Sequence, residues 1–557
     1  MRLAILQSNP LVGAVHENLR ALIEQAESKI DQADLFITPE LALLGYPPRD
    51  LLSMRWLLEE ERAALESLKE WTARTGRGFL VGHSEGRDGP GHRLWNAATL
   101  FWGGQSLGTV RKQRLPSYDV FDEERHFAAW PATEAQACFE VEGKKIGVFV
   151  CEDSWDSVTA FGKHDKLHYS ALGADPRLSA DVIVNLSASP YARRKRPARE
   201  SLFREWARRT QRPWLYANCA GAQDGLIFDG ASFAVDREGR ILRQASLFRS
   251  DALVIDLATL NGQGVEAARP FEEWHELGDA IVTGLGDFVR KSGARSVILG
   301  LSGGIDSALC ATLAAEALGP ENVKGVSLPS ALTSDLSRND AADLARRLGI
   351  AFEEIPIGEA VELHSRLTQA RPGSIAHQNL QSRNRGLLLM ARANQEQRLL
   401  IATGNKSEFA MGYSTLYGDM CGAIAPIGDL YKTEVYALCF DRNRRAREAG
   451  RQEPIPLSTL LRPPTAELAP DQKDTDSLPP YEILDIALEG ILENQGSPLY
   501  GREEKWGQLL QPRHTWASLR RQVLGQEFKR RQAPPILRLH DRSFGAGWQM
   551  PVAKGLS

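Results

Sequence analysis

Residues 296–307 read Ser-Val-Ile-Leu-Gly-Leu-Ser-Gly-Gly-Ile-Asp-Ser, and the apolar segment Ala308-Leu-Cys-Ala-Thr-Leu-Ala-Ala-Glu-Ala317 follows them. This order predicts a buried strand, a tight glycine turn and the start of a helix. Glycines let backbone N–H groups approach a ligand, and a helix N-terminus favours an anion. Asp306 is unexpected there, because a carboxylate beside a phosphate requires a cation such as Mg²⁺ between them. The stretch therefore predicts a phosphate-binding loop with a metal ligand.

This loop is not the usual P-loop, because the chain has no Gly-x-x-x-x-Gly-Lys-Ser/Thr. It resembles the pyrophosphate-binding loop of the ATP pyrophosphatases, which adenylate a substrate and release pyrophosphate. The resemblance implies that ATP is bound by Gly300, Leu301, Ser302, Gly303, Gly304, Ile305, Asp306 and Ser307. The alternative is a glycine-rich turn without a ligand. The aspartate and the two serines in one turn count against it.

The size and charge of the chain limit what it can be. Its 557 residues are too many for one hydrophobic core, so several domains are expected. It is 43% hydrophobic and 25% charged with a net charge of −4, which argues against a nucleic-acid binder held by charge. The basic run at 192–199 has no aromatic-rich basic neighbour. We interpret it as a solvated loop or a contact for an acidic ligand and expect no nucleic-acid partner.

The distribution of apolar residues and cysteines indicates the compartment. No run approaches 18 apolar residues, so we expect no membrane partner, and residues 1–9 indicate a first strand rather than a signal peptide. The six cysteines are scattered without a Cys-x-x-Cys pair, which disfavours zinc and fits a reducing environment. The sequence therefore predicts a cytoplasmic protein.

Strands and helices alternate through both halves, and the character of the chain changes at a polar connector. Residues 261–270, Asn-Gly-Gln-Gly-Val-Glu-Ala-Ala-Arg-Pro, carry glycines and a proline after a strand-rich region. Beyond Phe271 helices dominate up to the strand before Ser302. We therefore predict two α/β domains, at 1–265 and 266–557.

In the first domain, short predicted strands end on chemically active side chains. The strand Ala33-Asp-Leu-Phe-Ile-Thr-Pro-Glu40 ends in a carboxylate, and Lys145-Ile-Gly-Val-Phe-Val-Cys151 ends in a thiol. Lys112 begins an acidic loop between them. A cysteine nucleophile needs a base and a cation that stabilises the oxyanion. Taken singly, each residue also fits a structural role, as a buried small residue, a helix cap or a solvated lysine.

Together these segments resemble the glutaminase form of the nitrilase family, which carries Pro-Glu, Lys-x-x-Leu-Pro and Cys-Glu-Asp segments. The resemblance implies an α-β-β-α sandwich with Glu40 as general base, Lys112 as its electrostatic partner and Cys151 as nucleophile. It implies that Glu123 orients the lysine. It also implies glutamine contacts from Tyr118, Ser189 and Lys195.

The position of Cys151 excludes two other kinds of glutaminase. Amidotransferases with an N-terminal nucleophile need Cys at residue 2, where this chain has Arg. The Cys-His-Glu class needs a Gly-x-Cys-x-Gly elbow, but the local sequence is Phe-Val-Cys-Glu-Asp.

The second half contains a further polar turn at the end of a predicted strand. Thr403-Gly-Asn-Lys-Ser-Glu408 follows the apolar run Arg398-Leu-Leu-Ile-Ala402, and Glu408 offers a second carboxylate near Asp306. Lys432 is suited to a phosphate or a developing charge. The alternative is that these segments form turns and a helix start without binding a ligand. The density of polar groups argues against it.

These segments are similar to those of the NAD synthetase family, which combines Ser-Gly-Gly-x-Asp-Ser, Thr-Gly-Asn-Lys-Ser-Glu, Tyr-Ser-Thr-Leu-Tyr-Gly-Asp and a late Pro-Pro-x-Ala-Glu-Leu. The resemblance implies a doubly wound parallel sheet of the ATP pyrophosphatase (adenine nucleotide alpha hydrolase-like) type. It implies that Asp306 and Glu408 hold Mg²⁺ and that Thr403 binds ATP. It further implies deamido-NAD contacts from Asn379, Glu408, Asp419, Lys432 and Lys529.

The resemblance covers nearly the whole chain and favours the glutamine-dependent form. It implies amidation of deamido-NAD to NAD through an adenylate, with release of AMP, pyrophosphate and glutamate, by a homo-oligomer with no bound organic cofactor. The chain departs from the family at His377-Gln378, Cys219 and Gly225. The alternatives are another ATP-dependent amidotransferase or thiolating enzyme, and a regulatory sensor with dead sites. A thiolating enzyme would need paired cysteines or a basic RNA-binding region, and a regulatory sensor would have lost the nucleophile, its base or the metal carboxylates.

Overall fold

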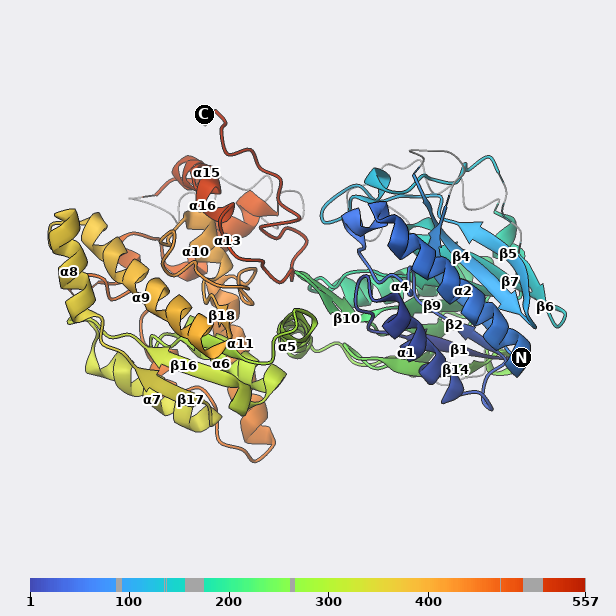
Figure 1. Ribbon diagram of the computed structural model, residues 1–557, viewed down its shortest axis with the longest axis horizontal. Coiled ribbons are helices and arrows are strands. Elements are labelled where there is room, and N and C mark those ends of the chain that lie inside the picture. Colours follow the sequence, from blue (N-terminus) through green and yellow to red (C-terminus); the bar gives the residue numbers. More distant parts are fainter. Residues whose placement is uncertain are drawn as a thin grey trace. The chain divides into compact units, whose positions relative to one another are not determined.

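The computed structural model describes residues 1–86, 93–134, 136, 138–155, 175–260, 266–470, 472–493 and 514–555. The chain forms two compact units, Met1–Phe271 and Glu272–Ser557 (Figure 1). Within the connector predicted at 261–270, residues 261–265 lie outside the described ranges. Among the described residues, no helix has the length and apolar character needed to cross a membrane.

The N-terminal unit contains two six-stranded sheets. In sheet order the first consists of β14 (Asp251–Asp256), β1 (Arg2–Gln7), β2 (Leu35–Ile37), β3 (Gly78–Glu85), β4 (Trp95–Trp102) and β5 (Gln105–Arg111). The second consists of β13 (Ile241–Gln244), β12 (Phe233–Val235), β9 (Trp214–Asn218), β8 (Val182–Ser187), β7 (Lys144–Val150) and β6 (Phe139–Val141). A separate hairpin pairs β10 (Ala220–Gln223) with β11 (Leu226–Asp229).

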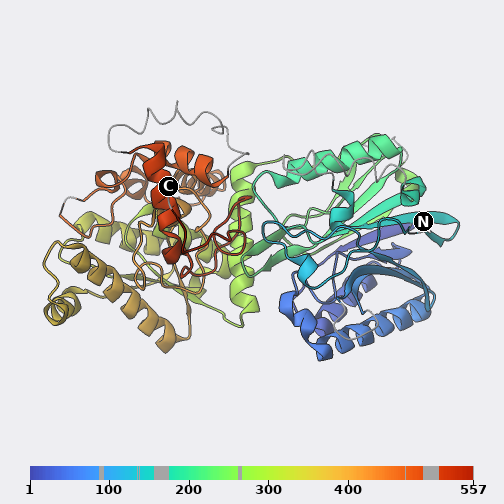
Figure 2. The same cartoon turned by 90° about the horizontal axis from the view of Figure 1, so that it is seen from above.

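Alternation along the strands explains why the two sheets stack. Leu3 and Ile5 of β1 join Val148 and Val184 of the second sheet in one buried cluster. The opposite face of the first sheet packs against α1 (Val15–Glu27) and α2 (Arg55–Thr75). The outer face of the second sheet packs against α4 (Lys195–Thr210). Figure 2 shows the four layers, with the blue helices and the blue-green α4 on opposite sides of the sheets. The predicted α-β-β-α sandwich is confirmed.

The C-terminal unit is built on a parallel sheet in the order β17 (Ala351–Glu354), β16 (Val323–Ser327), β15 (Val297–Gly300), β18 (Leu399–Ile401). Chain order reverses between β15 and β18, which is the doubly wound pattern, and the predicted parallel sheet is confirmed. In such sheets ligands bind at the carboxyl ends of the strands beside this reversal. The loop that follows β15 and the turn that follows β18 meet there.

Helices cover both faces of this sheet. Ile298, Val326 and Leu400 pack against α8 (Gly358–Thr368) and α9 (Ile375–Glu396). The alternate residues of β15 face the other way, where α6 (Ile305–Leu318) packs against β15 and β16. The other α-helices in the described part of the unit are α5 (Glu273–Lys291), α7 (Asp335–Leu348), α10 (Lys406–Met411), α11 (Lys432–Glu448), α12 (Leu457–Leu461), α13 (Tyr481–Leu492), α15 (Trp516–Gly525) and α16 (Glu527–Arg530).

Candidate active sites

Cys151 lies directly after β7, at the start of a short 3₁₀ turn, Cys151–Ser154. Its φ of 44° lies in the left-handed region, which is unfavourable for a residue with a side chain and is typical of functional positions. Asn185 on β8 holds this backbone by donating from Nδ2 to the carbonyl oxygen of Cys151 at 3.0 Å. The thiol is buried. The strand therefore presents one buried sulfur at its carboxyl end, as the sequence predicts.

Lys112 lies between two carboxylates. Its Nζ is 2.7 Å from Oε1 of Glu40 and 2.8 Å from both carboxylate oxygens of Glu123. All three side chains are buried. Burial alone would lower the pKa of Lys112, but the charges of Glu123 and Glu40 raise it well above its ordinary value. The structure thus brings together the three charged residues that the sequence assigns to one site.

The charges of Glu40 and Lys112 affect the pKa of the Cys151 thiol. Burial raises its pKa well above the ordinary value, the charge of Glu40 raises it further, and Lys112 opposes the rise. The resting sulfur is therefore protonated and needs a base to become nucleophilic. Burial also raises the pKa of Glu123 to about 7 against the lowering effect of Lys112. The arrangement can carry out base-assisted attack by a cysteine.

The structure gives each of the three predicted glutamine contacts a hydrogen-bond partner in the N-terminal unit. Tyr118 donates from its hydroxyl to Oε1 of Glu152 at 3.0 Å, and burial together with the charge of Glu152 raises the pKa of this hydroxyl well above its ordinary value. The backbone N–H of Ser189 donates to Asn218 at 2.9 Å. Lys195 donates to the carbonyl of Pro190 at 2.8 Å, and its Nζ lies 5.5 Å from the ring centroid of Trp155. Their role with glutamine stays a prediction.

Sequence reasoning missed two buried polar residues of this site. Tyr46 donates from its hydroxyl to Oε1 of Glu123 at 2.8 Å. Asn96 donates from Nδ2 to Oε1 of Glu40 at 2.7 Å. Tyr46 stands in the Gly-Tyr-Pro-Pro segment after Glu40, a signal that could have drawn notice. Asn96 stands in a strand that is apolar apart from Asn96 and Thr99, and it has no motif around it.

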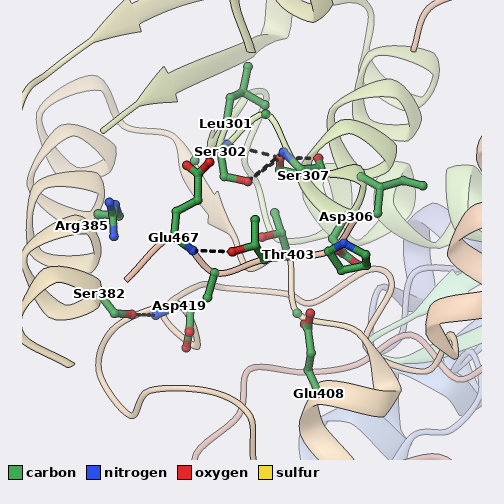
Figure 3. A pocket seen from close by; sticks show the side chains of 18 of the residues that line it. Leu301, Ser302, Asp306, Ser307, Ser382, Arg385, Thr403, Glu408, Asp419 and Glu467 are labelled. Carbon is green, nitrogen blue, oxygen red and sulfur yellow. Dashed lines mark hydrogen bonds between the residues drawn. The ribbon is translucent and has the colours of Figure 1, made fainter. Parts of the chain in front are cut away.

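The C-terminal unit contains a cavity of about 290 Å³ beside the carboxyl ends of β15 and β18. Residues 300–307 line it together with Thr403, Glu408, Asp419 and Lys432, all predicted from sequence. Figure 3 shows the loop above Thr403, with Asp419 and Glu408 on the other side of the pocket. The predicted ATP loop and most of the predicted deamido-NAD contacts therefore share one cavity.

Hydrogen bonds within the loop 302–307 hold it in a turn suited to binding an anion, which we call the anion cradle. Ser307 donates from Oγ to the carbonyl of Gly304 at 3.0 Å, and the N–H groups of Ser302 and Gly304 lie 3.3 and 3.2 Å from serine hydroxyls. Gly303 has a φ of 76°, and a Cβ there would lie 2.2 Å from the carbonyl oxygen of Ser337. Only glycine fits this close approach.

Asp306, Glu408 and Lys432 form the charged end of the cavity. Lys432 Nζ contacts Oδ2 of Asp306 and lies 3.7 Å from Oε1 of Glu408. Asn405 donates from Nδ2 to the other oxygen of Asp306 at 2.9 Å. Burial and the charge of Asp306 together raise the pKa of Glu408 to about 8 against the lowering effect of Lys432. Two carboxylates therefore share one lysine in a poorly solvated place.

This donor set fits the predicted Mg²⁺. Mg²⁺ is bound by one or two carboxylates together with substrate phosphates and waters, and Asp306 and Glu408 supply two carboxylates beside a phosphate-type loop. The described residues contain no cluster of three or more His, Cys, Asp or Glu suited to a metal. The protein alone supplies an incomplete set of ligands, as expected where ATP completes it.

Two predicted deamido-NAD contacts do not line the cavity. Asn379 accepts a hydrogen bond from the hydroxyl of Thr415 at 3.0 Å. Lys529 donates from Nζ to the carbonyls of Gly412 and Ser414 at 2.7 and 2.8 Å. Both residues therefore hold the segment 412–419, which also carries Asp419. Burial raises the pKa of Asp419 to about 6.

Sequence reasoning also missed Arg385 on α9, which lines the cavity. Its Nε donates to the carbonyl of Leu328 at 3.0 Å, and burial lowers its pKa to about 10. Among the described residues it forms no ion pair with a carboxylate. Figure 3 shows it across the pocket from Asp306. A partly buried guanidinium in a substrate cavity is suited to an anionic ligand.

Comparison with known proteins agrees with both sites. A family described as carbon-nitrogen hydrolase matches residues 2–269, and one described as NAD synthase matches residues 277–533. A glutamine-dependent NAD(+) synthetase of Synechocystis sp. is 43% identical over 569 residues, which cover 99% of this chain and 98% of the relative. One from Thermotoga maritima is 36% identical, covering 99% and 98%.

A solved structure is similar over the same length. The glutamine-dependent NAD⁺ synthetase from Acinetobacter baumannii in complex with adenosine diphosphate is 34% identical and superimposes with a TM-score of 0.76. The alignment covers 100% of this chain and 99% of that one.

Proposed function

This chain belongs to the family of glutamine-dependent NAD(+) synthetases, and we propose on this premise which of its residues carry the two half-reactions. The overall activity is the ligase reaction that makes NAD from deamido-NAD with ATP and glutamine. The observation that carries the assignment is the contact of Lys112 with both Glu40 and Glu123 around Cys151.

In the N-terminal unit, Glu40 takes the thiol proton of Cys151, and the thiolate attacks the amide carbon of glutamine. Lys112 stabilises the oxyanion, and Glu40 returns the proton to the leaving ammonia. A water molecule, deprotonated by Glu40, then cleaves the thioester and releases glutamate. Glu123 keeps Lys112 in place, and Tyr118, Ser189 and Lys195 bind the substrate.

In the C-terminal unit, the nicotinate carboxylate of deamido-NAD attacks the α-phosphorus of ATP. Pyrophosphate leaves into the loop at 302–307, where the backbone N–H groups and both serine hydroxyls receive it. Lys432, held by Asp306, neutralises negative charge that develops on the phosphates. Ammonia then attacks the adenylate carbonyl, AMP leaves, and one proton is lost. Mg²⁺, bound by Asp306 and Glu408, would supply charge neutralisation at the phosphates when present.

We propose further properties that follow from the same assignment. The functional domains are 1–265 and 266–557, the protein works in the cytoplasm, and it assembles as a homo-oligomer. Asn379 and Lys529 hold the segment 412–419. They act on deamido-NAD either by positioning this segment or by contacting the substrate next to it. Light scattering after size-exclusion chromatography tests the assembly, and a monomer at working concentration would contradict it.

The function is tested by incubating the protein with ATP, Mg²⁺, deamido-NAD and glutamine labelled with ¹⁵N in the amide. We expect labelled NAD together with AMP, pyrophosphate and glutamate. Formation of ADP instead of AMP would contradict the adenylate. Unlabelled NAD would contradict the transfer of nitrogen from glutamine.

A further inference from the structure

Asn96 contacts both charged partners of the proposed glutaminase site. It lies on β4 with 1% of its surface exposed. Its Nδ2 donates to Oε1 of Glu40 at 2.7 Å, and its backbone carbonyl accepts the N–H of Lys112 at 2.8 Å. One residue therefore fixes the carboxylate of the base and the backbone of the lysine.

The other end of the Asn96 side chain is unsatisfied. Its Oδ1 is fully buried and has no hydrogen-bond partner among the described residues. A reversed amide would place this oxygen against the carboxylate of Glu40, so the carboxylate itself fixes the orientation. Buried polar atoms are nearly always paired, and the exceptions require an explanation. The side-chain hydrogen bond that Asn96 makes in the described part of the structure goes to Glu40.

The two oxygens of Glu40 consequently have different surroundings. Oε1 accepts from Lys112 Nζ and from Asn96 Nδ2, both at 2.7 Å. Oε2 accepts only the backbone N–H of Ala188, at 3.0 Å, from the described residues. A carboxylate oxygen accepts about two hydrogen bonds, so Oε1 is saturated and Oε2 has one position left.

We propose that Asn96 is a positioning residue of the glutaminase reaction: with Lys112 it saturates Oε1 of Glu40 and leaves Oε2 to take the proton from Cys151 and return it to ammonia. The proposal rests on the assignment of Glu40 as general base. The contacts of Asn96 in this site are with Oε1 of Glu40 and with the backbone N–H of Lys112. It acts by fixing the rotation of the carboxylate and by favouring its charged form.

Removal of the amide therefore has two effects. The carboxylate becomes free to turn Oε1 toward the sulfur, and it loses one of the donors that oppose its protonation. The charged and titratable groups that face this centre are Lys112, Glu123, Cys151, Glu152 and Tyr46. The lysine remains in the variant, so Glu40 keeps its counter-charge and loses the donor that holds its rotation.

The test uses the full-length protein with Asn96→Ala and with the nearly isosteric Asn96→Asp. Glutamate release and ammonia-driven NAD synthesis are measured across pH. For Asn96→Ala we expect kcat with glutamine to fall about 100-fold, the cost of a misplaced catalytic group. KM for glutamine and the ammonia-driven rate stay close to wild type.

Asn96→Asp gives a signature that a structural role would not produce. Above neutral pH the new carboxylate repels Glu40, and glutaminase activity falls further than in Asn96→Ala. As the pH decreases, the new acid becomes protonated and donates to Oε1, so its activity relative to Asn96→Ala recovers. Asn18→Ala is the matched control, because Asn18 is a buried amide whose side-chain hydrogen bonds in the described part of the chain run to the backbone of Leu11 and Leu43. It should leave both kcat and the pH profile unchanged.

A wild-type kcat with glutamine in Asn96→Ala would overturn the proposal. A Glu40→Gln variant separates this failure from a failure of the general base. If Glu40→Gln still hydrolyses glutamine at the wild-type rate, the assignment of the base is wrong and the inference is lost with it. If Glu40→Gln is inactive while Asn96→Ala is unaffected, only the inference about Asn96 fails.

Discussion

Lys112 Nζ lies 2.7 Å from Oε1 of Glu40, and the side chains of both residues are completely inaccessible to solvent. The residues come from different strands of the first sheet, after β5 and after β2. Removing two charges from water is costly, and their attraction compensates only when the geometry is close and the remaining atoms are bonded. Glu123, Asn96 and Ala188 provide those bonds. The pair is therefore part of the reactive site, and removal of either charge would destabilise the N-terminal unit.

The first prediction concerns loss of this cation. Lys112→Met leaves Glu40 and Glu123 facing each other in a buried place without a counter-charge. We expect no detectable glutamine hydrolysis and a loss of about 3–5 kcal/mol in the free energy of unfolding of the N-terminal unit. Urea titration measures the loss. Lys69→Met on α2 is the control, because its side chain is 36% exposed and pairs only with Glu66. Equal stability of the two variants would contradict the argument.

The second prediction concerns a buried carboxyl away from either site. Glu61 on α2 contacts the N–H and the hydroxyl of Ser84, and burial raises its pKa from 4.5 to about 7. A carboxyl whose pKa is raised by folding stabilises the protein only while protonated. This stability is complete below pH 4.5 and is lost as the pH rises through 7. By pH 8 the loss amounts to about 3 kcal/mol.

Glu61→Gln imitates the protonated form and should remove this dependence. The variant should gain stability over the wild type between pH 5 and pH 8, by about 2 kcal/mol or more. Thermal unfolding at the two pH values measures the gain. Glu66→Gln, at an exposed position of the same helix, should show none. A gap between Glu61→Gln and wild type that stays constant with pH would show that Glu61 titrates normally.

The third prediction concerns the anion cradle. Gly303→Ala places a methyl group 2.2 Å from the carbonyl oxygen of Ser337 and requires a left-handed residue with a side chain. Gly304→Ala is the matched control, since its φ is ordinary and its nearest neighbour is the hydroxyl of Ser302 at 3.2 Å. We expect Gly303→Ala to lose ammonia-driven NAD synthesis, whereas Gly304→Ala keeps a measurable rate. Pyrophosphate release measures both. Equal rates would contradict a cradle that depends on close backbone approach.

The sequence alone predicted the reactive residues that follow directly after a strand. Cys151, Glu40 and the 302–307 loop each follow an apolar run, and that order of residues indicates both the strand and the position of the reactive group. The α/β class was predictable for the same reason, whereas the α-β-β-α sandwich and the doubly wound parallel sheet followed from the family resemblances. The contact of Glu40 with Lys112 followed from the family resemblance, because nothing in local periodicity brings together residues 72 positions apart.

The residues that the sequence did not indicate are those defined only by packing. Asn96 is one polar residue within the strand Trp95–Trp102, and its partner lies 56 positions away. Arg385 resembles any other arginine of α9 until the cavity is seen. Lys406 and Asp429 form a completely buried pair at 3.0 Å inside segments that had drawn attention for other residues. A single sequence contains no record of such long-range neighbours.

The central claim is that two separate sites in one chain supply nitrogen and consume it. The most direct measurement compares Cys151→Ala and Asp306→Ala in NAD synthesis driven by glutamine and by ammonium salt. We predict that Cys151→Ala loses the glutamine-driven rate and keeps the ammonia-driven rate, whereas Asp306→Ala loses both. A Cys151→Ala protein that still makes NAD from glutamine at the wild-type rate would contradict the account.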